Sequence, residues 1–452
     1  MFKVYGDVVY LSVFGQGFLI LRSQTRMNDL LEKRSSNYSD RPKSTMIFEL
    51  MGWDFNFALM PYGSWWRRHR RTFHNFFHPN VVNMYQPVQL KAARTLICNL
   101  FEFPDAIKKC AFLAFASTIT EVVYGIKIKG LDNNYIRSTE EALEGFPDAG
   151  IPGSYLVDMF PFMKYIPSWF PGAEWKRKAD HWRDVNREIC YGPFNLVKER
   201  IQAGTATPSI ATTLVEKLCD GEPHGRAEEE TIAMDVCGAA FSGGSETTVA
   251  ALWTFFMAMC VYPEAQRKGQ VELDAVLKGR LPGFEDQSSL PYINATVKET
   301  MRWKPVAPLG IMHTTTHDDE YGGYYIPKGT VVMGNAWTIL HDPEIYKYPH
   351  EYIPDCFIRD GEINRAVPDP SIAAFGFGRR ICPGRFLSDN SLFIMVAHIL
   401  TVYDIKPALD GAGNEIRITP DVTGGRTKFQ VLFTHGDLLL IFYLKATCTI
   451  PV

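Results

Sequence analysis

The segment Phe375–Gly384, which reads Phe-Gly-Phe-Gly-Arg-Arg-Ile-Cys-Pro-Gly, constrains the fold of this 452-residue chain more than any other. It places one cysteine in a glycine-rich turn, and a helical pattern follows directly. Because proline suits the first helical position, Pro383 predicts that Cys382 lies at the positive end of a helix, where a thiolate is favoured. Gly378 and Gly384 leave room for a flat partner against the backbone. A thiolate on such a loop is a good axial ligand for haem iron.

This segment resembles the haem-binding loop of the cytochrome P-450 family of haem-thiolate monooxygenases. The positions that match the family pattern are Phe375, Gly378, Arg380, Cys382 and Gly384. A single free cysteine is more often a small buried core residue, which is the alternative for Cys382. The number of matches within one short loop favours the ligand.

Composition leaves the chain in an ordinary globular class, with 46% hydrophobic and 21% charged residues. No linker, charge block or internal repeat divides it, so we expect one domain over residues 1–452. The net charge of −3 implies no nucleic-acid partner. Nine cysteines without paired or zinc-type spacing fit a reducing compartment.

The apolar stretch from Val8 to Leu21 is too short to span a membrane and is interrupted by Gly15 and Gly17. Its composition and its Gly-Gln-Gly turn predict a hairpin. Microsomal members of the resembled family begin with a membrane anchor, which we expect to be absent from this chain. The resemblance places the protein at the cytosolic face of the endoplasmic reticulum membrane, with a soluble form as the alternative. Residues 429–452 are an atypical tail for the family.

Helical periodicity dominates the rest of the chain. The proline-free stretch 228–261 would span on the order of 50 Å as one helix. The implied fold is mainly α with small β-sheets and a long central helix over the haem. Helices are predicted near residues 27–33, 64–75, 84–102, 106–124, 174–203, 228–261, 264–277, 293–303 and 383–403, and short strands within 309–340.

The long helix contains Ser242-Gly243-Gly244-Ser245-Glu246-Thr247-Thr248, which resembles the oxygen-activation motif of the family. Adjacent glycines cost about 1 kcal/mol each in a helix interior, but they permit a kink and open space beside the helix. Glu246 and Thr247 present an acid and a hydroxyl together, and such a pair can relay protons. The alternative is a plain helix crossing with Glu246 as a surface charge.

Glu299 and Arg302 lie three apart on a predicted helix and can pair on one face. An ordinary surface pair is the alternative, but the order of the motifs makes them resemble the structural Glu-x-x-Arg pair of the family. The family completes this network with a further arginine, where this chain has Cys356. We expect either a less rigid loop or a substitute arginine, Arg359 or Arg365.

Four residues resemble the family's contacts to the haem propionates. Trp66 and Arg70 share one helix face, and an indole N–H and a guanidinium are both donors suited to carboxylates. His313 matches a position that contacts a propionate, with a strand-edge histidine as the alternative, and Arg380 is the fourth candidate. The neighbouring residues Arg67, Arg68 and Arg71 read as a solvated basic face.

The resemblance implies a monooxygenase that inserts one oxygen atom of O2 into a small apolar organic molecule. Haem b would be held by Cys382, and electrons would come from a separate NADPH-dependent flavoprotein reductase. We expect a monomer with peripheral membrane contact, closest to fungal microsomal members that act in secondary metabolism. Residues 46–60, 143–170 and 306–311 should line the substrate pocket. Two alternatives stay open: a haem-thiolate isomerase or dehydratase that works without O2, and a degenerate, non-catalytic haem protein.

Overall fold

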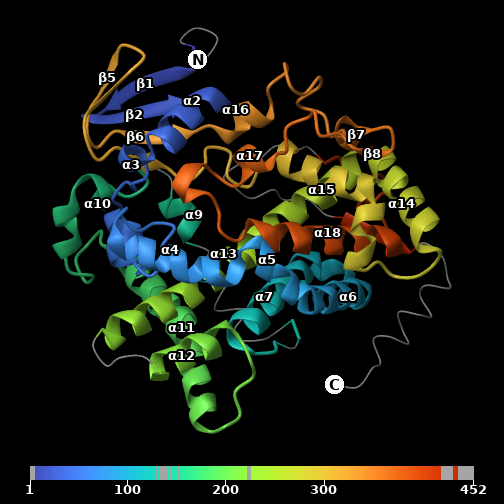
Figure 1. Ribbon diagram of the computed structural model, residues 1–452, viewed down its shortest axis with the longest axis horizontal. Coiled ribbons are helices and arrows are strands. Elements are labelled where there is room, and N and C mark those ends of the chain that lie inside the picture. The colour runs from blue at the N-terminus through green and yellow to red at the C-terminus, as the bar shows by residue number, and fades with distance from the viewer. Residues whose placement is uncertain are drawn as a thin grey trace.

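The predicted architecture, mainly α-helical with small sheets around one long central helix, is confirmed by the computed structural model (Figure 1). It describes residues 6–128, 130–131, 141, 145–150, 153–220, 225–418 and 431–435. The longer helices are α4 (Ser64–Phe77), α6 (Gln86–Glu102), α7 (Ile107–Tyr124), α11 (Glu174–Gln202), α12 (Ile210–Asp220), α13 (Arg226–Val261), α14 (Pro263–Leu277), α15 (Pro291–Trp303) and α18 (Arg385–Val402).

Prolines and glycines set several of these boundaries. Pro263 and Pro291 occupy the first position of α14 and α15, where the missing N–H costs nothing. Gly125 ends α7 with φ 64°, a left-handed conformation that glycine adopts without strain. The sequence placed the start of the last helix at residue 383, but α18 begins at Arg385, after the turn that holds Cys382.

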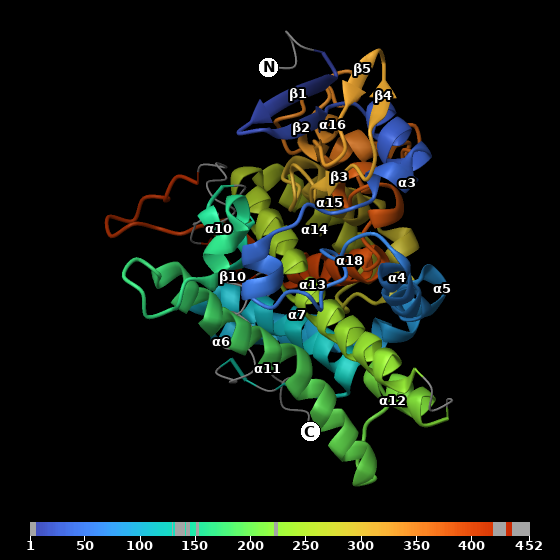
Figure 2. The same ribbon diagram turned by 90° about the vertical axis from the view of Figure 1, so that its left-hand side faces the viewer.

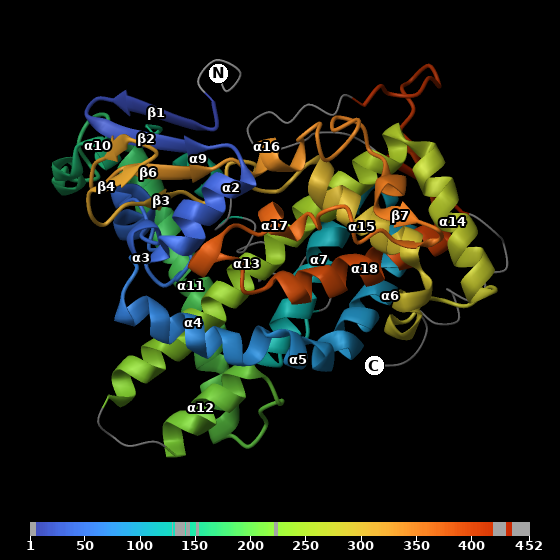
Figure 3. The same ribbon diagram turned by 45° about the horizontal axis from the view of Figure 1, so that its top comes forward.

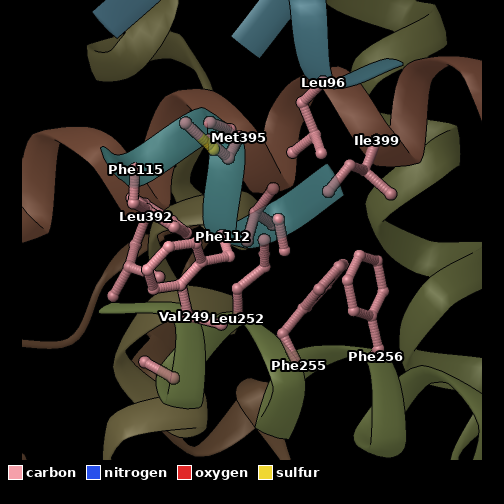
Figure 4. Close-up of a cluster of buried hydrophobic side chains, with 14 of the residues drawn as sticks. Leu96, Phe112, Phe115, Val249, Leu252, Phe255, Phe256, Leu392, Met395 and Ile399 are labelled. Carbon is pink, nitrogen blue, oxygen red and sulfur yellow. The ribbon is translucent and has the colours of Figure 1, made fainter. Parts of the chain in front are cut away.

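The largest core lies where α6, α7, α13 and α18 pack together (Figure 4). Leu252 and Phe256 of α13 are fully buried there, as are Leu96 of α6 and Ile399 of α18. Within the described part of the chain, α13 is the one helix long and apolar enough to cross a membrane. The most apolar window of α13 is 61% buried by the surrounding helices, as expected for the central helix of a globular core.

A four-stranded sheet, in the order β1-β2-β6-β3, covers one end of the helical body (Figures 1 and 2). The predicted hairpin is β1 (Val8–Val13) and β2 (Gln16–Leu21), which pair antiparallel. Its tight turn is at Phe14 and Gly15, both at positive φ, so that Gln16 and Gly17 already belong to β2. Leu19 and Leu21 both face the core, and the residues between them face the other way, which fixes the register of β2 beside β6.

The remaining elements are short. The sheet is completed by β6 (Val331–Gly334) and β3 (His313–Thr314), and three two-stranded sheets pair β4 with β5, β7 with β8 and β9 with β10. Of the tail at 429–452, residues 431–435 are described, and they form β10 against β9. The bounds are β4 (Asp319–Tyr321), β5 (Tyr324–Ile326), β7 (Ile358–Arg359), β8 (Glu362–Ile363), β9 (Tyr403–Pro407), β10 (Val431–His435), α2 (Gln24–Met27), α3 (Ser35–Tyr38), α5 (Pro79–Val82), α9 (Phe146–Ala149), α10 (Leu156–Met159), α16 (Ala336–Leu340) and α17 (Ser371–Ala374).

Candidate active site

The loop between α17 and α18 is closed by its own backbone. The N–H of Cys382 donates to the carbonyl of Phe375 at 2.8 Å, and the N–H of Ile381 donates to Gly378 at 3.1 Å. Gly378 has φ +56°, and a Cβ there would clash with the carbonyl oxygen of Leu31. Gly378 therefore seats the loop on the helical segment Asn28–Lys33, and it is not among the residues that line the central cavity.

Cys382 and Gly384 do line a central cavity of about 320 Å³, and a Cβ on Gly384 would be 4.0 Å from the Cys382 sulfur. Burial raises the pKa of the Cys382 thiol, while the Gly384 N–H and the nearby Arg70 and Arg385 lower it. The effect of the helix start, which was predicted to favour the thiolate, is smaller than the effect of burial on this pKa. A bound metal ion would reverse the balance, because a thiol that coordinates a metal is deprotonated outright.

The cavity extends between this loop and α13, which run beside each other through the centre of the molecule (Figure 3). Its walls are largely aliphatic and aromatic, and they come from α4, α7, α13, α18 and several loops. Of the predicted pocket segments, 46–60 and 306–311 contribute, through Asn56, Phe57, Ala58, Val306, Ala307, Gly310 and Ile311. The described residues of 143–170 do not; residues 143–144 and 151–152 lie outside the described part.

The two glycines of α13 have different roles. A Cβ on Gly243 would meet nothing within 4 Å, and this residue opens onto the cavity. A Cβ on Gly244 would come within 3.1 Å of Ile119, so this glycine lets α7 pack closely. Thr247 also lines the cavity, and its hydroxyl donates to the Gly243 carbonyl at 2.8 Å. Glu246 is exposed and is not part of the lining.

Trp66 and Arg70 of α4 both line the cavity. The Trp66 side chain is 4% exposed, and its indole Nε1–H has no hydrogen-bond acceptor among the described residues. Burial lowers the pKa of Arg70 to about 10, and no acidic side chain of the described residues forms an ion pair with Arg70. A buried N–H and a half-buried cation without partners are costly, and both would be satisfied by an anion in the cavity.

Arg380 stacks over the ring of Trp66, 4.4 Å from its centroid. Its guanidinium donates to the carbonyls of Ser39 at 2.7 Å, Phe57 at 3.2 Å and Met60 at 2.7 Å. Arg380 therefore ties the cysteine loop to the segment before α4. Three of its N–H groups are engaged in this way, and a guanidinium has five, which leaves donors for a ligand.

His313 of β3 also lines the cavity, and its Nδ1 is 2.8 Å from the Tyr38 carbonyl oxygen. Since a carbonyl can only accept, Nδ1 carries the proton. Burial, with Arg41 and Arg380 nearby, holds the pKa of His313 well below its usual range. In this tautomer Nε2 is an acceptor, so His313 would donate to a carboxylate only after that carboxylate had raised its pKa.

Arg41 was not predicted as a site residue, yet it lines the cavity and is fully buried. Its guanidinium donates to the carbonyls of Ala58 at 2.8 Å and of Ile311 and Met312 at 2.7 Å. A lone arginine in a loop has no spacing that would have identified it. Arg41, Arg70 and Arg380 together form what we call the cationic wall. The wall and the free Trp66 N–H fit a ligand that carries carboxylates, as haem does with its propionates.

Glu299 and Arg302 lie outside the cavity, on α15, and both are fully buried. Arg302 donates Nε to Glu299 Oε2 at 2.6 Å and Nη2 to Oε1 at 2.8 Å. Its remaining N–H groups reach the carbonyls of Leu340, Pro349 and Glu351 at 2.7–3.0 Å. Glu299 also accepts the N–H of Ile353 at 2.6 Å.

This network needs no substitute for the arginine that Cys356 replaces. Cys356 lies close to both Glu299 and Arg302, and burial raises the pKa of its thiol to about 12. Arg359 faces Asp360 at the surface, and Arg365 is exposed, so the expectation that either joins the network is wrong. Three backbone carbonyls satisfy Arg302 instead.

Comparison with known proteins places this geometry in a family. The profile described as Cytochrome P450 matches residues 1–433. Cytochrome P450 monooxygenase COX2 of Coprinopsis cinerea is 46% identical over 423 residues, which cover 93% of this chain and 80% of the relative. Cytochrome P450 monooxygenase 98 of Postia placenta is 40% identical, with 95% and 82% covered. Tryptamine 4-monooxygenase of Psilocybe cyanescens is 40% identical, with 93% and 83% covered. The chain therefore belongs to the cytochrome P450 family of haem-thiolate monooxygenases.

Proposed function

We propose that this monooxygenase holds haem b on the Cys382 thiolate and inserts one oxygen atom of O2 into a small apolar molecule. Electrons come from a separate NADPH-dependent flavoprotein reductase. The observation that carries the proposal is the cavity itself, which brings Cys382, the open face of Gly243 and Thr247, and the cationic wall together. The whole chain, residues 1–452, acts as one monomeric domain.

In this proposal the haem supplies O2 binding and O–O cleavage when it is bound. The propionates are held by the Trp66 N–H, Arg70 and the unused donors of Arg380, and by His313 once protonated. Thr247 holds a proton at its hydroxyl inside the cavity, and the adjacent Glu246 is exposed to solvent. Protons pass from Glu246 to Thr247 and so reach the cavity.

Apolar side chains supply most of the cavity wall around α13. Phe115 and Ile119 of α7, with Val306 and Ile311 of the segment before β3, face the same space as Gly243. Their surface supports an apolar substrate, because burial of apolar area would provide the main binding energy.

Two exposed apolar groups support peripheral contact with the endoplasmic reticulum membrane. Phe14 at the β1–β2 turn is 90% exposed. Phe162, Tyr165 and Trp169, in the segment after α10, are 69–78% exposed. The hairpin and α10 lie on the same flank of the molecule, on the left in Figures 1 and 3. Several large apolar side chains this exposed on one flank are typical of a surface that contacts a membrane or another protein.

The test is the carbon monoxide difference spectrum of the reduced, haem-loaded protein. We expect a strongly red-shifted Soret band that is lost in Cys382→Ser and kept in Cys219→Ser, which removes an exposed cysteine of α12. We also expect NADPH- and reductase-dependent O2 uptake with an apolar substrate. A wild-type band at the position of neutral ligands would overturn the ligand assignment, and turnover without O2 would point to an isomerase.

A further inference from the structure

The polar groups of the cavity wall are nearly all committed to partners within the protein. The hydroxyls of Thr118 and Thr247 donate to carbonyls one helical turn earlier, at 2.8 Å each. The ammonium of Lys304 lies over the rings of Trp303 and Trp337, 5.4 and 5.2 Å from their centroids. The cationic wall and Trp66 face the proposed propionates.

The exceptions are Asn56 and the pair Thr248 and Ser388, whose hydroxyls are 3.5 Å apart, and of these Asn56 has the amide donor. Asn56 lies in the loop before α4 and lines the cavity. Its Oδ1 accepts the N–H of Ala58 at 3.0 Å, which fixes the orientation of the amide, because the backbone N–H needs an acceptor. The amide Nδ2 then points toward Ser242 of α13, whose Oγ is 3.4 Å away, near the limit for a hydrogen bond.

An amide nitrogen carries two N–H donors, and this long contact uses at most one of them. The Ser242 hydroxyl itself donates to the Ala239 carbonyl at 3.3 Å, so it can only accept from Asn56. Ser242 directly precedes Gly243, whose side is open to the cavity. Asn56 is therefore a cavity-lining residue with a fixed amide and an N–H to spare, beside the α13 opening.

We propose that Asn56 is a specificity-determining residue and that the substrate is a neutral, apolar molecule that already carries an acceptor oxygen, such as a ketone or an alcohol. The Asn56 N–H binds this oxygen and fixes which carbon faces the reactive centre. This inference rests on the proposed function. In a reaction sequence, the preceding enzyme must be one that leaves an oxygen on an otherwise apolar skeleton.

The same wall argues against an amine substrate. Among the described residues that line the cavity, none is aspartate or glutamate, and the proposed propionates are already paired with the cationic wall. A protonated amine would lose its hydration without gaining a counter-ion. Although one relative is named for tryptamine, the described lining of this chain has no group that would pair with such a cation.

Three probes with one skeleton test the proposal: decalin, 2-decalone and 2-aminodecalin, which is protonated at neutral pH. Their dissociation constants are measured from the Soret shift of the ferric holoenzyme. We expect the wild type to bind 2-decalone about three- to tenfold more tightly than decalin, the effect of one net hydrogen bond. The ammonium probe should bind more weakly than either.

Two variants make the result specific to the amide. Asn56→Asp keeps the acceptor for Ala58 and replaces the donor by a carboxylate, so it should lose the preference for the ketone and bind the ammonium probe more tightly. Asn56→Leu should lose the ketone preference without weaker binding of decalin. Thr118→Val, whose hydroxyl proton is committed to Ala114, is the matched control and should retain the preference.

The carbon monoxide spectrum of every variant distinguishes failure of the Asn56 proposal from failure of the proposed haem-thiolate function. With a normal thiolate band, equal wild-type affinity for ketone and hydrocarbon would overturn the inference, and so would a ketone preference that survives in both Asn56 variants. A missing thiolate band in the wild type would instead mean that the proposed function itself fails.

Discussion

Replacing Glu299 by glutamine should show how much of the stability depends on a buried charge. The carboxylate accepts three N–H groups, two from Arg302 and one from Ile353, at 2.6–2.8 Å. Glutamine keeps one oxygen and turns an NH2 group toward a donor. Breaking a buried ion pair costs about 3–5 kcal/mol, and we expect the lower end because three carbonyls still solvate Arg302.

Because the chain is long, this loss of stability corresponds to only a small decrease in Tm. At about 2.1 cal/mol/K per residue, a chain of 452 residues has an unfolding entropy of about 0.9 kcal/mol/K. A loss of about 3 kcal/mol therefore lowers the Tm by about 3 °C. The Tm is followed in the haem-loaded protein as the temperature at which half of the red-shifted Soret band of the carbon monoxide complex is lost.

The chain offers a matched control. Glu264 and Arg267 on α14 have the same three-residue spacing and the same two-point contact, at 2.7–3.1 Å, but both are largely exposed. Because water screens this pair, Glu264→Gln should leave the Tm unchanged within error. If both variants shift the Tm equally, burial is not the source of the effect and the reasoning is refuted.

Further predictions concern the cavity and the proximal loop. Trp66→Phe keeps the ring beneath Arg380 but removes the N–H, and we expect haem to dissociate about 10- to 100-fold faster, measured by haem transfer to an acceptor protein. Gly378→Ala should destabilise the protein by about 2 kcal/mol or more, because of the positive φ and the Leu31 carbonyl, while Gly243→Ala should be tolerated. Unfolding in urea measures both, and a larger loss of stability in Gly243→Ala would contradict this prediction. Burial raises the pKa of Asp389 to about 7, so the folded state binds the extra proton and stability falls as pH rises from about 4 to 7. Asp389→Asn should remove this pH dependence, which amounts to at most about 4 kcal/mol of unfolding free energy. If the unfolding free energies of the wild type and the variant differ by the same amount at every pH in this range, the assignment is contradicted.

Local patterns predicted the elements well because they reflect local physics. The helical periods gave α13 to within two residues at its start, and the composition of residues 8–21 with its Gly-Gln-Gly segment gave the hairpin. The cysteine loop was found from the spacing of its own residues. The Glu299–Arg302 pair was found from its three-residue spacing together with its position relative to the cysteine loop. In these cases the residues that interact are close in the chain.

Long-range packing could not be predicted in the same way. Arg41 is a loop residue without periodicity, and only the folded chain brings it to the cavity. The resemblance placed the segment 46–60 at the pocket, but no pattern singled out Asn56 within it. The role of Gly378 depends on Leu31, far away in the sequence, and Arg302 is satisfied by carbonyls that no side-chain pattern encodes. The same limit explains the mistaken expectation for Arg359.

The bond from Arg380 to the Ser39 carbonyl joins positions 341 residues apart. On a ribosome that adds about 5–20 residues per second, the segment around Ser39 waits roughly 20 to 70 s before Arg380 has been synthesised. For most of that time Arg41 and Trp66 have been made, but Cys382 has not. The pocket therefore cannot be completed before the cysteine loop has been translated, and a haem that depends on Cys382 can be held only after that point.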